Sequence, residues 1–163
     1  MTAGENLIVQ STTNNSNTRY ADYAHLTNDL TDGSFWHVSE YFQGSRRNMV
    51  AQFLIEPAGA NDIGVINIAQ GFDKPVYVLP IPNTDNELLV IEQKGLVRLV
   101  RNNKISDTPF LDIRDRVHKP LFPGDEMGML GFAFDPDFND NKYFYVHYND
   151  KEDKTVISRF IVK

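Results

Sequence analysis

The sequence has 163 residues, and its 16 Lys and Arg against 22 Asp and Glu give a formal net charge of −6 and a pI near 5.1. Hydrophobic residues at 41% and aromatic residues at 12% supply enough apolar surface for a packed core, which excludes global disorder. An acidic chain without a cluster of Lys or Arg has no electrostatic attraction to polyanions, so we expect no nucleic-acid partner and no membrane partner.

Three further features limit the class of protein. The chain contains no Cys, which excludes disulfides, thiolate zinc sites and cysteine nucleophiles. Its apolar runs, such as residues 88–91, are far shorter than the ~20 residues that a membrane-spanning helix needs. The opening residues lack the basic start and apolar core of a secretory signal.

Residues 1–58 combine a polar opening with two runs that predict strands, SFWHVSEYF at 34–42 and NMVAQFLIE at 48–56. Two or three strands cannot bury a sheet alone. We therefore interpret residues 1–58 as the C-terminal remnant of an upstream β domain. The alternative is an extra layer on the sheet that follows. The small and polar residues from Pro57 to Asp62 are typical of a linker, which we place at 59–70.

Residues 71–113 contain β-rich runs joined by turn residues. Asn83 to Asn86, Lys94-Gly95 and Asn102-Asn103 suit the positive φ of tight hairpins. Four antiparallel strands in about 40 residues match the size of one propeller blade. The predicted strands are VYVLPI (76–81), ELLVIEQ (87–93), LVRLVR (96–101) and KISDTPFLDI (104–113).

A second unit follows, with predicted strands GMLGFAF (128–134), KYFYVHY (142–148) and TVISRFIV (155–162). A complete blade needs one more strand, and without it the last strand leaves an unpaired hydrophobic edge. We therefore expect a chain truncated at its C-terminus. The predicted fold class is all-β: a partial β-propeller preceded by a short β-rich segment.

Segments of residues 71–163 occur in the order typical of one family: GFDKPVYVLPIPNTDNELLVIEQKGLVRLVRNN, GDEMGMLGFAFDPDF, KYFYVHYND and TVISRF. This part of the chain resembles the start of the glucose/sorbosone dehydrogenase family, the soluble quinoprotein sugar dehydrogenases. The resemblance implies a secreted or periplasmic six-bladed propeller that holds pyrroloquinoline quinone and calcium and oxidises aldoses by hydride transfer to the quinone. Six blades need roughly 250 residues, so residues 71–163 would form only the first one to two.

The resemblance carries one site residue into this sequence. In the family's Gly-(Glu/Gln)-x-Gly-Leu-Leu-Gly pattern the acidic or amide residue faces the cofactor, and here that position is Glu126. Some members have glutamine there, and Asp135 stands where histidine is common. The family's catalytic base is a histidine in a His-Asn-Gly-Gly segment, which this sequence lacks. We therefore assign no catalytic residue and no metal ligand, expect neither cofactor to bind this fragment tightly, and expect the fragment to be inactive.

A second hypothesis is a non-catalytic propeller that binds carbohydrate or acts in adhesion. The segments RYADY (19–23) and DGSFWHVSEY (32–41) weakly resemble the last blade of sialidase-like repeat propellers. Aromatic side chains in the strands could stack on sugar rings, although alternating aromatic residues are more often core. These are Phe35, Trp36, Tyr41, Phe42, Tyr143, Phe144, Tyr145 and Tyr148.

The other polar residues are best explained by ordinary structural roles. The oxygen-rich run from Asp135 to Asn141 suggests calcium, but it lacks the glycine and glutamate of an EF-hand, which favours a β-turn. The four histidines, His25, His37, His118 and His147, lack metal-ligand spacing and are expected in the core or on the surface. No Gly-x-Ser-x-Gly motif indicates a hydrolase nucleophile.

Overall fold

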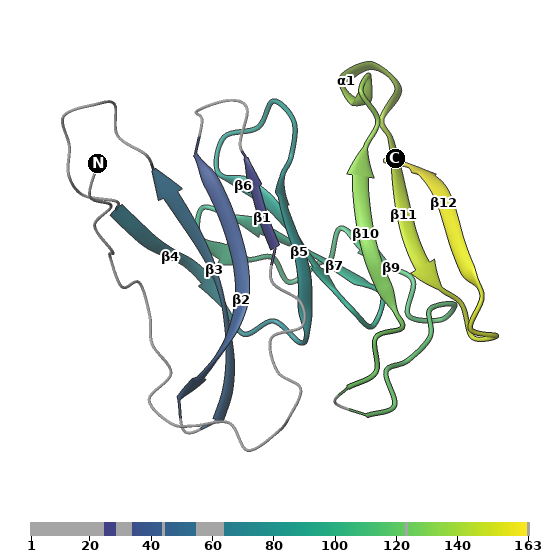
Figure 1. Ribbon diagram of the computed structural model, residues 1–163. Coiled ribbons are helices and arrows are strands. Elements are labelled where there is room, and N and C mark those ends of the chain that lie inside the picture. Colours follow the sequence, from purple (N-terminus) through teal and green to yellow (C-terminus); the bar gives the residue numbers. More distant parts are fainter. Residues whose placement is uncertain (1–24, 29–33, 44, 55–63, 123, 163) are drawn as a thin grey trace, which may run out of the picture.

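The computed structural model describes residues 25–28, 34–43, 45–54, 64–122 and 124–162, and within them three antiparallel sheets lie side by side (Figure 1). The first sheet contains β1 (His25–Asn28), β2 (Phe35–Gln43), β3 (Ser45–Leu54) and β4 (Gly64–Gln70). The second contains β5 (Pro75–Pro80), β6 (Glu87–Glu92), β7 (Leu96–Arg101), β8 (Lys104–Ile105) and β9 (Leu111–Asp112). The third contains β10 (Met129–Phe134), β11 (Tyr143–Asn149) and β12 (Thr155–Ile161). This arrangement confirms the all-β fold class and the partial propeller.

The second sheet follows the sequence pattern closely. Its strands run in the order β5-β6-β7-β8, and consecutive strands are joined by tight turns. Asn102, Asn103 and Gly95 adopt φ values of 47°, 62° and 101°, which Asn and Gly tolerate in hairpin turns. This is the meander expected for one blade.

The predicted strand at 104–113 is wrong in its middle. The structure has two short strands there, β8 and β9, which pair with opposite ends of β7. The four residues Ser106 to Pro109 form a bend between them, and Pro109 has no N–H to donate to a ladder. The chain therefore leaves the edge of the sheet and returns to it.

Two hydrophobic cores lie on the two faces of the second sheet. Leu88 and Val90 of β6 belong to the core shared with the first sheet, and Leu89 and Ile91 belong to the core shared with the third. All four side chains are at most 1% exposed. Burying one such side chain contributes about 1.5–3 kcal/mol, so β6 stabilises both sheet interfaces at once.

The N-terminal sheet differs from the sequence interpretation in two ways. Residues 64–70, which we placed in a linker, form β4 and pair with β3 because the run VINIA supplies β-branched residues. In addition, Trp36, Val38 and Val50 pack into one core with residues of the second sheet. The described part of the first sheet thus packs as a layer on the second, while the interpretation of residues 1–58 as the remnant of an upstream β domain stays a prediction. The domain boundaries as a whole stay a prediction.

The third sheet ends the described chain. β11 lies between β10 and β12, and the register pairs His147 with Ile157. Inward residues of β12, including Phe160, pack on the core, whereas Ile157 on the outer face is 73% exposed. Among the described strands β12 is therefore an edge strand, and its outer face carries two exposed isoleucines, Ile157 and Ile161.

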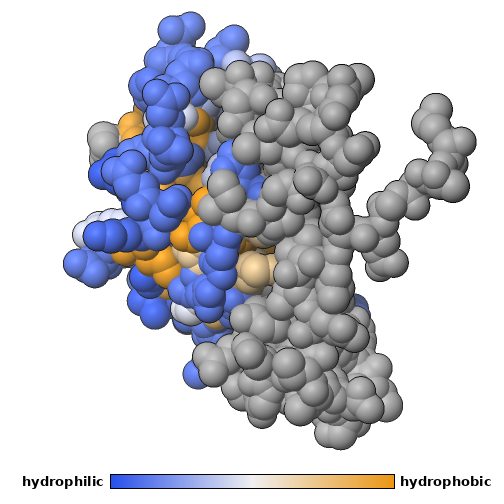
Figure 2. Space-filling view, turned by 90° about the vertical axis from the view of Figure 1, so that its left-hand side faces the viewer, coloured by the Kyte–Doolittle hydropathy of each residue, from blue (hydrophilic) through white to orange (hydrophobic). Residues whose placement is uncertain are grey.

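The helical content is small. The short helix α1 (Phe138–Asn141) connects β10 to β11, and within the described residues no helix has the length and apolar character to cross a membrane. Figure 2 shows the side of the molecule that lies on the left in Figure 1. There the described residues are mostly hydrophilic, with hydrophobic residues between them.

Candidate functional site

Glu126 lies in the connection from β9 to β10, residues 113–128, of which residue 123 is outside the described part. Glu126 is exposed, whereas the preceding residue, Asp125, is 5% exposed. The loop contacts three neighbouring segments, which fix its position: the β6–β7 turn, the start of β10 and the β11–β12 turn.

Gln93, in the β6–β7 turn, binds the main chain on both sides of Glu126. Its Nε2 donates to the carbonyl oxygen of Asp125 at 2.6 Å and to that of Met127 at 3.0 Å. The Gln93 side chain is 2% exposed, so both carbonyl groups are satisfied away from water. The structure therefore presents Glu126 from a main chain that is fixed to the second sheet.

Gly128 brings the loop against the same turn. The main-chain N–H of Met129 donates to the carbonyl of Gln93 at 2.7 Å, and Gly128 has a φ of +141°. A Cβ at Gly128 would lie 2.4 Å from the Gln93 carbonyl oxygen, closer than atoms can approach. The glycine of the sequence motif is thus required by this close approach.

His118 and two carboxylates join the loop to the third sheet. The His118 Nε2 lies 2.9 Å from Asp125 Oδ2, and its Nδ1 lies 2.8 Å from Asp153 Oδ1 in the β11–β12 turn. Asp125 also accepts hydrogen bonds from the main-chain N–H groups of Leu121 and Met127, both at 3.0 Å. We call His118, Asp125 and Asp153 the histidine cluster.

The charges of the histidine cluster stabilise one another. The hydrogen bond to Asp125 raises the pKa of His118, and the bond to Asp153 adds to this. Burial of Asp125 opposes its ionisation, but the hydrogen bonds from Leu121, His118 and Met127 outweigh burial and lower the pKa of Asp125. Both carboxylates therefore favour the protonated form of His118.

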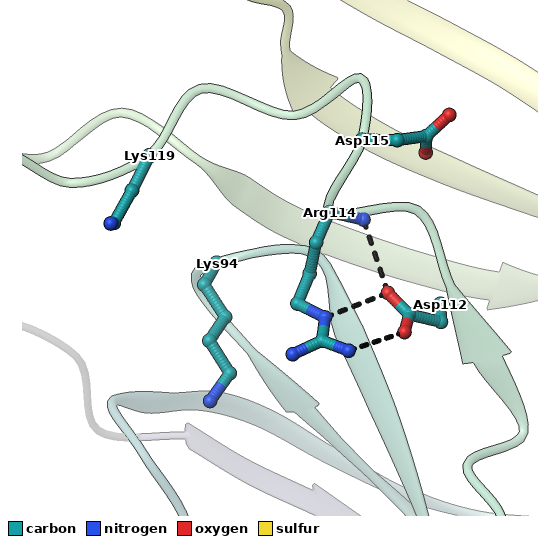
Figure 3. Close-up of a pocket in the computed structure, with 5 residues that line it drawn as sticks. All are labelled: Lys94, Asp112, Arg114, Asp115 and Lys119. Atoms are coloured by element: carbon teal, nitrogen blue, oxygen red, sulfur yellow. Dashed lines mark hydrogen bonds and ion pairs between the residues drawn. The ribbon is translucent and has the colours of Figure 1, made fainter.

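A pocket of about 660 Å³ opens beside the β6–β7 turn, lined by Lys94, Asp112, Arg114, Asp115 and Lys119 (Figure 3). Arg114 binds Asp112 through two side-chain hydrogen bonds, from Nε at 2.8 Å and from a terminal nitrogen at 2.6 Å. These bonds lower the pKa of Asp112. Lys94 pairs with Asp73 at 2.9 Å and with Glu92 at 3.2 Å. The pocket thus combines cations and carboxylates, a mixture suited to polar ligands.

The run Asp135 to Asn141 forms the turn that its composition favours, followed by the short helix α1, which the sequence analysis did not predict. Asp135 accepts hydrogen bonds from Asn141 Nδ2 at 2.8 Å, from the main-chain N–H of Asp137 at 3.0 Å and from the Tyr145 hydroxyl at 2.9 Å. The bond from Asn141, with the others, lowers the pKa of Asp135. These bonds account for the Asp135 carboxylate without a metal ion.

The aromatic residues of the third sheet divide between its two faces. Phe144 is 3% exposed and stacks on Phe132 and Phe160, with ring centroids 5.0 and 5.4 Å apart, and Tyr148 is 5% exposed. These residues belong to the core, so stacking of sugars on them is excluded. Tyr143 lies on the other face, where Arg159 sits 4.4 Å from its ring centroid.

Among the aromatic residues of β2, Trp36 has a defined place in the core. Trp36 is 6% exposed and belongs to the core between the first and second sheets. The side chains of Tyr41 and Phe42 lie outside the described residues, as does the segment 19–23, and the resemblance to sialidase-like repeats stays a prediction.

The sequence predicted only some of the residues that fix the geometry of this loop. The family pattern identified Glu126 and the glycine after it. Gln93 and His118 carry no motif spacing, and His118 was grouped with the ordinary histidines. Gln93 binds Asp125, 32 residues away, and the His118 ring joins Asp125 to Asp153, which is 35 residues away, so no local pattern indicates these contacts.

The resemblance implies calcium and pyrroloquinoline quinone, so the oxygen ligands that the loop could offer them can be counted. Calcium takes six to eight oxygen ligands. The loop offers two exposed carboxylates, at Asp115 and Glu126, and the carbonyl groups beside Glu126 are already bound by Gln93. In the part of the chain that the structure describes, no group of three or more His, Asp, Glu or Cys side chains could hold a metal ion. Alone, these residues do not fit calcium or the quinone, and Glu126 supplies one side of such a site at most.

Comparison with known proteins identifies the family. A model of the glucose/sorbosone dehydrogenase family matches residues 72–163. Relatives include Hedgehog-interacting protein from Homo sapiens, 30% identical over 91 residues, and from Mus musculus, 28% identical over 98 residues. The matches cover 55% and 60% of this chain but only 13% and 14% of those relatives. With more than half of its residues matched by the family model, the chain belongs to the glucose/sorbosone dehydrogenase family.

Proposed function

We propose that the chain is the N-terminal part of a quinoprotein aldose dehydrogenase, secreted or periplasmic, and is inactive by itself. The observation that carries this proposal is the fixed presentation of Glu126 in the family's own motif. Gln93 binds the carbonyl groups on both sides of Glu126, so the main chain that carries this residue is fixed to the end of the second sheet. A carboxylate in this position accepts hydrogen bonds from the hydroxyl groups of a sugar.

The remaining parts of the reaction must come from a longer protein. His118 cannot serve as the base that removes a hydroxyl proton, because both of its ring nitrogens are bonded to carboxylates. A closed six-bladed ring needs roughly 250 residues. The proposal therefore requires a reading frame that continues past Lys163 with further blades and a His-Asn-Gly-Gly segment.

The test uses the intact gene product, loaded with pyrroloquinoline quinone and calcium and mixed with a panel of aldoses and a redox dye. We expect aldose-dependent dye reduction. Glu126→Gln keeps a hydrogen-bonding group and should retain activity, whereas Glu126→Ala should raise KM. Glu152→Gln, in the exposed β11–β12 turn, is the matched control and should leave the kinetics unchanged. No reduction with any aldose would overturn the proposal.

A second candidate is a non-catalytic propeller that binds a glycan or a protein. The observation that favours it is the name of two relatives, Hedgehog-interacting protein, which describes binding and not oxidation. A glycan array and the dye assay, both run on the intact protein, separate the two candidates. Glycan binding without dye reduction supports the second, and dye reduction supports the first.

A further inference from the structure

The His118 ring makes two hydrogen bonds that require its charged form. Both ring nitrogens lie within 2.9 Å of carboxylate oxygens, one from Asp125 and one from Asp153. Neutral imidazole carries one N–H, so it can donate to only one of these oxygens and would turn a lone pair toward the other. The observed geometry is that of an imidazolium ion.

This charged ring connects the loop 113–128, which contains both His118 and Glu126, to the third sheet; we call the loop 113–128 the Glu126 loop. Asp153 lies in the β11–β12 turn, and the main-chain N–H of His118 donates to the Asn149 carbonyl at 2.8 Å. Asp125, on the opposite side of the ring, accepts from Leu121 and Met127 and so sets the main chain before and after Glu126. Loss of the proton from His118 would remove one of the two hydrogen bonds that its ring makes to Asp125 and Asp153.

We propose that His118 is a positioning residue whose protonation holds Glu126 and its neighbours in the binding position, so that this part of the loop 113–128 loosens when rising pH removes the proton. The consequence for a ligand rests on the proposed function, in which Glu126 touches the sugar. The coupling between His118 and the loop does not depend on that function.

The charged groups that face the His118 ring all stabilise its protonated form. The carboxylates that face the ring are Asp125 and Asp153, from the two segments packed against it. Neighbouring charges of the β11–β12 turn bind within the turn: Asp150 accepts the main-chain N–H groups of Glu152 and Lys154, and Lys154 pairs with Glu152. No cation among the described residues is paired with Asp125 or Asp153 in place of His118.

The sign of the pH effect follows from the raised pKa of His118. The contribution of His118 is fully present below its unfolded value, near pH 6.5, and is lost as pH rises through the higher folded value. The lowered pKa of Asp125 gives the opposite limit, because its contribution disappears only in acid.

The first test follows the titration of His118 by NMR in the full chain. The imidazole C–H resonance reports protonation, and the main-chain N–H resonances of Leu121 and Met127 report the loop. We expect both to change with one shared midpoint above that of an unperturbed histidine. If the resonances of Leu121 and Met127 do not change as His118 titrates, the proposal is overturned, and this test needs no variant.

The second test weakens one side of the cluster. Asp153→Asn removes a carboxylate whose side chain is 60% exposed and leaves the bonds of Asp125 to the loop in place. Asn also tolerates the φ of +62° at this position. We expect roughly a tenfold loss of proton affinity at His118, which moves both midpoints down by about one pH unit. The matched control, Glu152→Gln in the same turn, should leave both midpoints in place.

A binding readout separates this inference from the proposed function. In the intact protein, KM for the aldose should rise above the His118 midpoint, and Asp153→Asn should shift that rise to lower pH while kcat changes less. If no sugar is oxidised but the NMR midpoints still move together, the proposed function fails and the positioning role stands. If Asp153→Asn leaves both midpoints where they were, the positioning role fails.

Discussion

At Gly128 a single methyl group decides whether the loop fits against the β6–β7 turn. Gly128→Ala would place its Cβ 2.4 Å from the Gln93 carbonyl oxygen at a φ of +141°, so overpacking adds to backbone strain. We expect a loss of roughly 3 kcal/mol in the free energy of unfolding, measured by urea denaturation. Gly71→Ala is the matched control, because Gly71 has a φ of +97° but nothing within 4 Å. It should cost about 1 kcal/mol, and equal losses would contradict the close approach.

Gln93 provides the second prediction at the scale of the residue. Gln93→Met keeps the length of the side chain but removes the N–H groups that bind the carbonyls of Asp125 and Met127. Leaving buried carbonyl groups without a donor costs about 1–3 kcal/mol, so we expect a destabilisation of that size. Hydrogen exchange of residues 124–128 should also become faster. Unchanged exchange in this segment would show that Gln93 does not hold the loop.

The candidate site was predictable in sequence only where a residue type has a local signature. Glu126 and Gly128 stand in a motif of consecutive residues. Gln93 acts through partners more than 30 residues away, and His118 joins a carboxylate 7 residues away to one 35 residues away, while a Gln in a turn or a single His has many ordinary roles. The histidine cluster forms only because the sheets bring two loops together, which is information that spacing along the chain does not contain.

At the scale of the element, the strands with strong β patterns were predicted within one or two residues of their observed ends. β5, β6, β7, β10, β11 and β12 all have apolar or aromatic runs bounded by turn residues. β1 and β4 were missed because HLTN is short and polar and GVINIAQ follows a stretch that looks like a linker. Pairing with β2 and β3 makes these segments strands, and tertiary context overrides their weak local preference.

The edge strand β12 gives a prediction about self-association. Ile157 is 73% exposed on a strand with one unpaired edge, so copies of the chain can pair through it. Ile157→Lys should reduce concentration-dependent association, measured by sedimentation velocity, and should change stability by less than about 0.5 kcal/mol. Thr108→Lys adds the same charge at an exposed position away from this edge. If both variants act alike, net charge and not the edge controls association.

At the scale of the whole molecule, the two cores should make the three sheets unfold together. Trp36 is the single tryptophan, and its fluorescence reports the core between the first and second sheets. Leu88→Ala opens that core and Leu89→Ala opens the other, and each should cost about 2–5 kcal/mol. In each variant, the unfolding transition seen by Trp36 fluorescence and the one seen by far-UV circular dichroism should shift by the same amount. A Trp36 transition that Leu89→Ala leaves unmoved would show that the first sheet unfolds independently.

The double burial of β6 also limits how this strand can change during evolution. On an ordinary half-buried strand, every second position faces water and tolerates drift. On β6 each residue from Leu88 to Glu92 is buried, and successive residues from Leu88 to Ile91 pack alternately into the two cores. An accepted substitution at one position needs compensation in the first sheet, and at the next position in the third. Related sequences should therefore diverge more slowly along β6 than along β12.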